Sequence, residues 1–329
     1  MSNTTPHAAA DAKLSAAHLR RVHITSGCHD CDELPKAPHA GQIVGDETGR
    51  YQIMHNGLQV LEGGYCGEWM TEIIRRLRGH HEPQEEKVFH ELLARIPAGG
   101  TMVELGSGWA FYSLWFARQV RDARLVCVEP DPANLNVGER NFRRNGVSGR
   151  FVRASVGNRS LPPRPFPCEA GPPVDTPEIS VDDLVAREAL DAIDLLFADI
   201  QGAELSMLHG AAHAIAAGKI RFVIVATHHH TISQDPLTHQ HCLTWIQEHG
   251  GHVICAFNVV EGYSGDGMIA ASFRESDRSL PSIEVSRNHP TNSLFRELEY
   301  DLAEAQAKLD KYRRWFAWLP KSKKSRRVA

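Results

Sequence analysis

Short apolar runs of strand type alternate with stretches of helical period from residue 101 to about residue 272, and this alternation constrains the fold more than any other feature. Continuous apolar strands separated by helices are typical of a mostly parallel sheet with helices on both faces. The last two runs follow each other without a helix, so we expect an antiparallel pair at the sheet edge. The sequence therefore predicts an α/β fold with a seven-stranded sheet. The runs span residues 101–105, 124–130, 150–157, 194–200, 221–227, 252–260 and 267–273.

Residues 159–178 interrupt this alternation. They hold seven of the 18 prolines of the chain, and we interpret them as a long surface loop. The segments between the other runs have helical period. Helices are expected near residues 110–119, 132–144, 203–217 and 238–249.

The chain before residue 80 has a different character. Residues 1–45 are polar and without a sustained period, which predicts a loosely ordered lead-in. Residues 51–61 place Asn56-Gly57 between two short apolar runs, a strong hairpin signal, because both turn residues would take positive φ. Helices are predicted at 67–78 and 82–96.

The chain after residue 274 reads as one long helix over residues 292–319. Its apolar residues step by three and four, which fits either a coiled-coil seam that would join two copies or a helix packed on its own domain. The basic tail that follows has aromatic neighbours, so it would either contact a membrane surface or be solvated. The seam residues are Leu298, Leu302, Ala305, Leu309, Tyr312 and Phe316, and the aromatic residues beside the tail are Trp315, Phe316 and Trp318.

Charge and cysteine content exclude several classes of function. The formal net charge is −4, so no global positive field exists to hold nucleic acid. No apolar run is long enough to span a membrane, and the N-terminus has no secretory signal pattern, so we expect a cytoplasmic protein with reduced thiols. Cys28 and Cys31 form a C-x-x-C, but no second pair follows at zinc-site spacing. We interpret them as two thiols on an exposed loop.

The most specific segment runs from Glu104 to Ala110. It ends a strand and opens a helix, and Gly106 and Gly108 allow a tight turn with close approach of the backbone to a ligand. The helix N-terminus behind the turn offers free N–H groups. A Rossmann dinucleotide site is the competing interpretation, but Phe111 stands where its third glycine would be.

The next strand ends in Glu129, an acid about 20 residues beyond the glycines, where a ribose diol would bind. The pattern E-x-G-x-G-x-A followed by V-x-V-E-P is similar to class I S-adenosylmethionine-dependent methyltransferases. The resemblance implies a Rossmann-like fold in which Glu104 and the glycine turn face the methionine end of the cofactor, and Glu129 holds its ribose. The residues that it assigns to the cofactor are Glu104, Gly106, Ser107, Gly108, Trp109, Glu129, Pro130, Ser155 and Asp199.

A third motif indicates the family more specifically. Asp199-x-x-Gly-Ala-Glu204 at the end of the fourth run, with Leu-x-Gly-Ala after it, resembles the FkbM family of methyltransferases over roughly residues 80–272. The resemblance implies an O-methyltransferase that acts on a saccharide or a glycosylated or other natural-product acceptor. The family usually carries a Glu two positions before the His that ends the fifth run, where this chain has Ala226. The role of that Glu is then lost or supplied elsewhere.

Strand ends in an open α/β sheet line the ligand crevice, so Asp199 should lie beside the histidines that end the fifth run. Methyl transfer to a hydroxyl needs a general base, and our candidates are Asp199, His228 and His229. Asp199, Glu204 and His228 are also weaker candidates to bind Mg²⁺ or Mn²⁺, which could chelate a sugar diol.

The residues before the cofactor motif could contribute to the acceptor site. Aromatic side chains there could support a sugar ring, although core packing is the alternative for Trp69, and Trp109 is the better candidate for a ligand-facing ring. We divide the chain into an N-terminal extension that caps the acceptor site (1–79), a methyltransferase domain (80–274), and a C-terminal helix with its tail (275–329). The acceptor-site candidates are Tyr65, Glu68, Trp69, His80 and His81.

Two alternatives to a methyltransferase remain at this stage. A nicotinamide-dependent oxidoreductase would share the glycine turn and the ribose acid. A non-catalytic scaffold would keep the cofactor fold and associate through residues 292–319, and the altered position 226 favours it to some degree.

Overall fold

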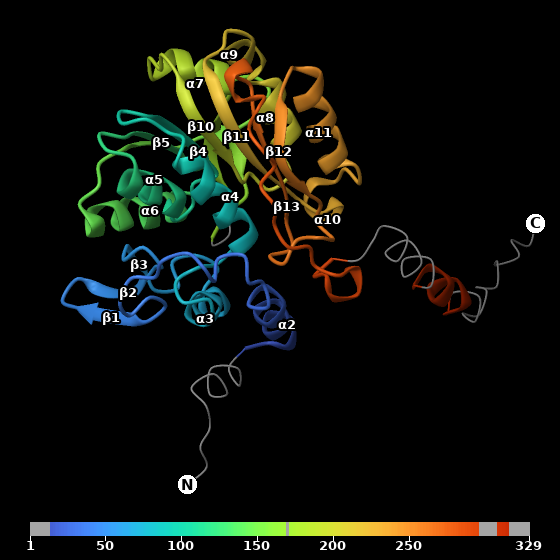
Figure 1. Ribbon diagram of the computed structural model, residues 1–329. Coiled ribbons are helices and arrows are strands. Elements are labelled where there is room, and N and C mark those ends of the chain that lie inside the picture. Colours follow the sequence, from blue (N-terminus) through green and yellow to red (C-terminus); the bar gives the residue numbers. More distant parts are fainter. Residues whose placement is uncertain (1–13, 169–170, 296–307, 316–329) are drawn as a thin grey trace, which may run out of the picture.

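The computed structural model describes residues 14–168, 171–295 and 308–315. Its centre is a seven-stranded sheet in the order β12-β13-β11-β10-β4-β5-β6 (Figure 1). Neighbouring strands from β11 to β6 are parallel, whereas β13 is antiparallel to both β11 and β12. The predicted sheet and its antiparallel edge pair are confirmed. The strands are β4 (Thr101–Leu105), β5 (Arg124–Val128), β6 (Arg150–Val152), β10 (Ile193–Ala198), β11 (Ile220–Thr227), β12 (His252–Phe257) and β13 (Gly267–Ser272).

Helices cover both faces of this sheet. Side chains alternate along each strand, so Leu195 and Phe197 of β10 enter one apolar core while Leu196 and Ala198 enter the other. The first core also contains Ile73 and other residues from before residue 80, so the N-terminal segment shares a core with the sheet. The first core also receives side chains from the helices α2 (Ala16–Thr25), α3 (Glu68–Arg76), α4 (Pro83–Leu93), α5 (Phe111–Gln119) and α6 (Pro132–Asn145), and the second from α7 (Val181–Arg187), α8 (Glu204–His209), α9 (Ala212–Ala216) and α11 (Thr238–Glu248).

The helix predicted over 203–217 is divided into α8 and α9. Asp182, from the start of α7, causes the break. Its carboxylate accepts hydrogen bonds from the backbone N–H groups of His213 and Ala214, and so caps a new helix start. Its own N–H donates to the carbonyl of Gly210 at the break.

The predicted loose lead-in is wrong for the described residues 14–45. They form the helix α2 (Ala16–Thr25), capped by Ser15, and the strand β1 (Ile43–Asp46). The helix packs on α3 (Glu68–Arg76), a partner that local sequence does not reveal.

The hairpin predicted over 51–61 is confirmed. β2 (Gly49–Ile53) pairs with β3 (Gln59–Leu61) and with β1 in a small antiparallel sheet. The turn is wider than an Asn-Gly type I′ turn, because only Gly57 has positive φ and the Asn56 side chain instead accepts from the Leu58 N–H.

The predicted surface loop at 159–178 is also wrong, because it contains a β-hairpin. β8 (Leu161–Phe166) pairs with β9 (Val174–Ile179), which also pairs with β7 (Ser155–Val156). Three prolines lie in β8, an edge strand whose outer N–H groups need no partner, so the missing donors cost little.

The C-terminal region is described only in part. Residues 290–295 hold a 3₁₀ turn, η2 (Pro290–Asn292), rather than the start of the predicted α-helix, and another 3₁₀ turn, η1 (Glu275–Asp277), precedes it. Residues 308–315 are helical, with Leu309, Tyr312 and Trp315 exposed. The rest of the predicted 292–319 helix, with Leu298, Leu302, Ala305 and Phe316, and the basic tail lie outside the described residues. Within the part of the chain that the structure describes, no helix has the length and apolar character needed to cross a membrane.

Position 106, directly after β4 and beside the end of β10, requires a glycine. Its φ is +73°, and a Cβ there would lie 1.8 Å from the carbonyl oxygen of Asp199. We expect Gly106→Ala to lower the free energy of unfolding by roughly 3 kcal/mol or more, because both backbone strain and a clash must be relieved. Gly146→Ala is the matched control: its φ is +64°, with no atom within 4 Å of the added Cβ, so the cost should be about 1 kcal/mol. Denaturant unfolding measures both, and equal costs would contradict the role assigned to the close approach.

Candidate active site

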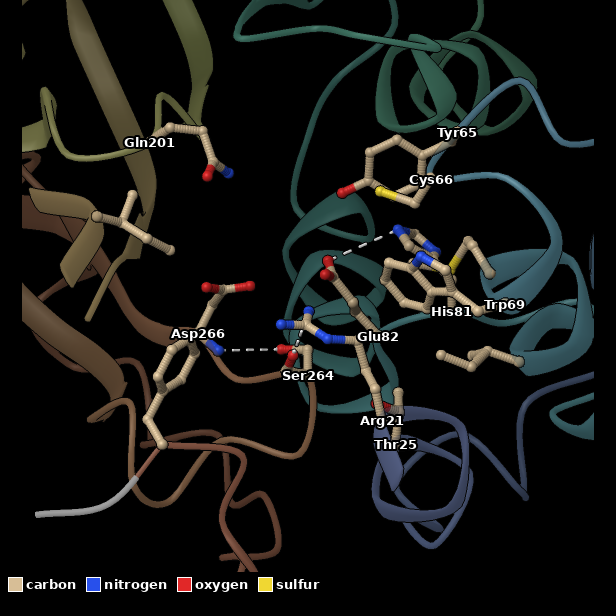
Figure 2. A pocket seen from close by; sticks show the side chains of 14 residues that line it. Arg21, Thr25, Tyr65, Cys66, Trp69, His81, Glu82, Gln201, Ser264 and Asp266 are labelled. Atoms are coloured by element: carbon tan, nitrogen blue, oxygen red, sulfur yellow. Dashed lines mark hydrogen bonds and ion pairs between the residues drawn. The ribbon is translucent and has the colours of Figure 1, made fainter. Parts of the chain in front are cut away.

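A cavity of about 180 Å³ lies where the carboxyl ends of the central strands meet the N-terminal segment. Figure 2 shows Tyr65, Trp69 and His81 on one side of it and Gln201 and Asp266 on the other. The predicted proximity of the N-terminal extension to the strand ends is therefore observed. The lining side chains belong to Arg21, Thr25, Tyr65, Cys66, Trp69, Met70, Ile73, His81, Glu82, Gln201, Ile232, Ser264, Asp266 and Phe295.

Asp199 and His228 come together beside this cavity, as the strand order requires. Nε2 of His228 lies 3.1 Å from Oδ1 of Asp199, and Nδ1 lies 2.8 Å from Oε1 of Glu204. Oδ1 of Asp266 is 3.6 Å from Nε2. The side-chain amide of Gln201 also donates to Asp199, at 3.1 Å. A buried imidazole is thus surrounded by three carboxylates.

These neighbours set the charges of the pair. Burial opposes a charged His228, but Asp266, Asp199 and Glu204 raise its pKa well above the ordinary value. Burial also opposes an ionised Asp199, yet the hydrogen bond and the charge of His228 lower its pKa. Both shifts favour the ion pair of a protonated His228 and an ionised Asp199. A protonated imidazole cannot accept a proton, so the structure favours Asp199 over His228 as the base.

His229 is placed differently from His228. Its Nδ1 accepts from the Thr231 N–H and caps the short helix α10 (His230–Ser233), and its ring stacks on Phe295 with centroids 4.4 Å apart. Its Nδ1 is thus engaged at the start of α10. The structure therefore does not bring His229 into the carboxylate cluster.

Asp266 was not among the sequence candidates. β13 runs antiparallel to β11, with Thr227 opposite Gly267, so the residue before β13 lies beside the residue after β11. This register places Asp266 against His228. An acid directly before the predicted antiparallel strand was the available signal. Asp266 also gives His228 a carboxylate neighbour although position 226 is alanine.

Asp199, Glu204 and His228 do not form a common ion site in this arrangement. Asp199 and Glu204 contact opposite nitrogens of the same imidazole ring, whose lone-pair directions diverge. The two carboxylates therefore lie on different sides of the ring. The proposed Mg²⁺ or Mn²⁺ set does not fit the observed geometry.

The glycine turn and Glu129 form one connected unit. The Gly108 N–H donates to Oε2 of Glu129 at 2.8 Å, and the Asp131 N–H donates to Oε1. Within the described structure, the buried hydroxyl of Ser107 has no hydrogen-bond partner. A buried, unpaired hydroxyl beside a strand-end acid fits a polar ligand at this turn.

Glu104 lies beneath this turn. It is buried, and its Oε2 accepts from the Ser113 N–H of α5 at 2.9 Å. Burial raises its pKa to about 8, although Ser113 opposes the shift. The side chain thus supports the helix start behind the turn.

The remaining cofactor candidates lie around the same strand ends with different contacts. Trp109 is buried and stacks on Tyr65 with centroids 4.9 Å apart, so it supports a cavity-lining ring rather than lining the cavity itself. The hydroxyl of Ser155 donates to the carbonyl of Pro177 on β9, at 3.4 Å. The Pro130 carbonyl is 3.5 Å from the hydroxyl of Thr176 on the same strand.

Among the predicted acceptor residues, Tyr65, Trp69 and His81 line the cavity, whereas Glu68 and His80 do not. Glu82, the N-cap of α4, also lines the cavity, and its carboxyl is hydrogen-bonded to that of Glu85. Burial raises the pKa of Glu82 well above its ordinary value and that of Glu85 to about 8, and Tyr112 donates to Glu85 at 2.6 Å. Burial thus favours the uncharged form of the Glu82 carboxyl in the cavity wall.

Comparison with known families decides between the two enzyme classes. The family model of the Methyltransferase FkbM domain matches residues 94–253. Residues 94–253 form an FkbM methyltransferase domain. This domain belongs to the class I S-adenosylmethionine-dependent methyltransferases, and the nicotinamide-dependent alternative is set aside. The segment contains the glycine turn, Glu129, Asp199 and His228.

Two solved structures illustrate the wider similarity. A precorrin-6y C5,15-methyltransferase from Geobacter metallireducens GS-15 has 14% identity and a TM-score of 0.36, over 56% of this chain and 87% of that one. The magnesium protoporphyrin IX methyltransferase from Synechocystis PCC 6803, with bound S-adenosylmethionine, has 11% identity and a TM-score of 0.40, over 60% of this chain and 81% of that one. No curated protein matches the chain in sequence.

Glu104 should make stability depend on pH. Its pKa is about 8 in the folded chain and near 4.5 when unfolded, so between these values only the folded chain keeps the proton. The free energy of unfolding should therefore fall as pH rises through this window. Glu104→Gln should remove up to about 1.4 kcal/mol per pH unit of that slope. Urea unfolding between pH 5 and 7 measures it. Exposed Glu248→Gln should leave the slope unchanged, and an unaltered slope in Glu104→Gln would refute the assignment.

Proposed function

We propose that the FkbM domain transfers a methyl group from S-adenosylmethionine to a hydroxyl of a saccharide or glycosylated natural product. The observation that carries this proposal is the Asp199 carboxylate, which is paired with His228 and hydrogen-bonded to Gln201, a residue that lines a cavity with aromatic and polar walls. An ionised acid next to an acceptor-sized space suits the deprotonation of a hydroxyl.

Residues of the glycine turn and the strand ends would hold the cofactor. The Gly106–Gly108 turn allows close approach of the backbone, the Ser107 hydroxyl is available as a donor, and Glu129 lies at the strand end where a ribose diol would bind. When bound, S-adenosylmethionine supplies an electrophilic methyl group on a sulfonium. The site residues fit this cofactor because the strand-end acid, the turn and the unpaired hydroxyl are contiguous.

Asp199 receives the proton in this proposal. The acceptor hydroxyl donates a hydrogen bond to Asp199, and its O–H bond breaks as the new O–CH₃ bond forms and the electron pair of the S–CH₃ bond returns to sulfur. His228 and Gln201 hold the carboxylate in one orientation. Orientation is the main contribution of the protein to such a transfer.

The cavity walls suit an acceptor that is rich in hydroxyls. Tyr65 and Trp69 contribute aromatic rings, and Arg21, Glu82 and Asp266 contribute polar groups that can form hydrogen bonds with hydroxyls. The N-terminal segment then acts as an acceptor cap.

Asp199→Asn should lower turnover by at least about 100-fold while cofactor affinity stays nearly unchanged, because the amide keeps the shape but cannot take the proton. Transfer of radiolabelled methyl to fractionated cell glycans measures turnover, and calorimetry measures affinity. Asp235→Asn, on the turn after α10, is the matched control and should remain active. Full activity of Asp199→Asn would remove Asp199 from the reaction. Cofactor binding by the wild type without transfer to any fraction would favour a scaffold.

Trp69→Ala should raise KM for the acceptor about tenfold and leave the Kd of S-adenosylmethionine unchanged, because the ring lines the cavity away from the glycine turn. Trp69→Phe keeps a ring face and should restore most of the acceptor binding. Steady-state kinetics with the labelled acceptor fraction gives KM. An unchanged KM, or a loss of cofactor binding instead, would place the acceptor elsewhere.

A further inference from the structure

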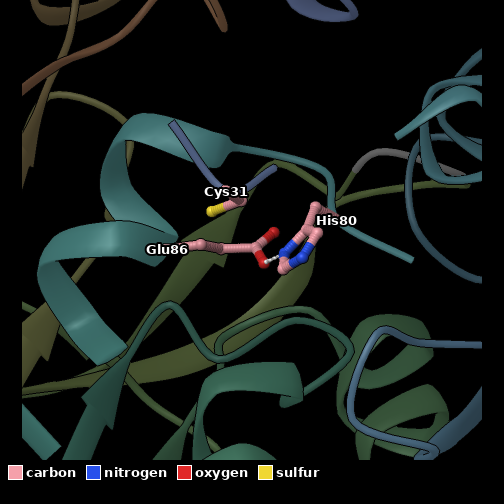
Figure 3. A group of neighbouring side chains, drawn as sticks. All are labelled: Cys31, His80 and Glu86. Atoms are coloured by element: carbon pink, nitrogen blue, oxygen red, sulfur yellow. Dashed lines mark hydrogen bonds and ion pairs between the residues drawn. The ribbon is translucent and has the colours of Figure 1, made fainter. Parts of the chain in front are cut away.

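A buried cluster outside the proposed active site brings together a thiol, an imidazole and a carboxylate. Figure 3 shows Cys31, His80 and Glu86 facing one another. One ligand atom from each lies within 4.8 Å of the others, and all three side chains are buried. They come from three segments: the turn after α2, the loop before α4, and α4 itself. The prediction of an exposed loop for Cys28 and Cys31 is therefore wrong, because both thiols are buried.

A second imidazole is aimed at the same carboxylate. Nδ1 of His55 lies 3.7 Å from Oε2 of Glu86, and its ring stacks on His80 with centroids 4.1 Å apart. His55 is only 4% exposed, and within the described structure its Nδ1 has no hydrogen-bond partner. Because the two rings lie face to face, their in-plane lone pairs do not converge on one point, so His55 packs on the cluster rather than acting as a ligand.

We propose that Cys31, His80 and Glu86 bind a structural Zn²⁺ ion. One sulfur, one imidazole nitrogen and one carboxylate oxygen are ligand types that zinc takes, and a water molecule would complete a four-coordinate site. A thiolate and a carboxylate would balance the charge of the ion, so that the buried site is neutral overall. On binding, the Cys31 S–H gives up its proton to solvent as the S–Zn bond forms.

The sequence could not reveal this site from cysteine spacing. Only one cysteine of the C-x-x-C joins it, because Cys28 is directed toward Asp30 and Ser286. The other two ligands come from residues 80 and 86, and no spacing rule links them to Cys31.

The ion would fix one wall of the acceptor cavity. Oε1 of Glu86 accepts from the backbone N–H groups of His81 and Glu82, at 2.7 and 3.2 Å, and both of those residues line the cavity. Zinc at Glu86 would therefore hold the segment that carries them. It would not touch the acceptor or the cofactor, so its role is structural.

The test uses the full chain, purified without chelators or metal-affinity resin. Mass spectrometry of metals should find one zinc per chain. After the zinc is removed, titration with Co²⁺ should give the visible bands of a tetrahedral site and a near-ultraviolet thiolate-to-cobalt band. Cys31→Ser should abolish the thiolate band and weaken Co²⁺ binding by at least about tenfold. Cys242→Ser, which removes a buried thiol from α11, is the matched control and should keep both.

Several results would overturn the proposal: wild-type protein without stoichiometric zinc whose apo form gives no cobalt bands, or a thiolate band that survives in Cys31→Ser. If Cys31→Ser does not fold, His80→Ala provides a second test, because it should keep the thiolate band and alter the visible bands. An unchanged visible spectrum in that variant would refute the site. These readouts do not depend on methyl transfer, so failure of the zinc site is distinguishable from failure of the proposed reaction.

Discussion

The close approach of two strand ends is the constraint on which the site depends. β4 and β10 lie side by side, and the Asp199 N–H donates to the carbonyl of Leu105 at 3.0 Å. The next residue, Gly106, can turn away only because it has no Cβ. This contact sets the glycine turn directly against the segment that carries Asp199. A cofactor at the turn and a base at Asp199 are therefore neighbours as a consequence of backbone packing.

Electrostatics then determines what the neighbouring groups can do. His228 lies among Asp199, Glu204 and Asp266, and this arrangement keeps the imidazole protonated and Asp199 ionised. Burial raises the pKa of Glu104 to about 8. Among the described residues, Glu104 has no cationic partner comparable to His228 that would oppose this shift. One buried region thus contains acids in opposite protonation states, and the difference comes from the nearest charge.

The N-terminal segment is joined to this region through Glu86. Its carboxylate meets the loop before α4 and the side chains of His55 and His80, while α6 holds the hairpin through hydrogen bonds from the backbone of Gln59 and Leu61 to Asn145 and Asn141. The extension and the sheet consequently share one apolar core. The aromatic wall of the cavity therefore has a fixed position relative to Asp199.

The sequence by itself determined the sheet, the order of its helices, the family motifs and the meeting of Asp199 with His228, because apolar periodicity and strand-end position are local properties of the chain. Only the tertiary structure decided which residues complete the site. α2, the β8–β9 hairpin, the approach of Asp266 to His228 and the burial of Cys31 beside Glu86 all depend on partners distant in sequence. The pKa shifts of the buried acids and of His228 also follow only from the tertiary structure, because they depend on burial and neighbouring charge rather than on residue type.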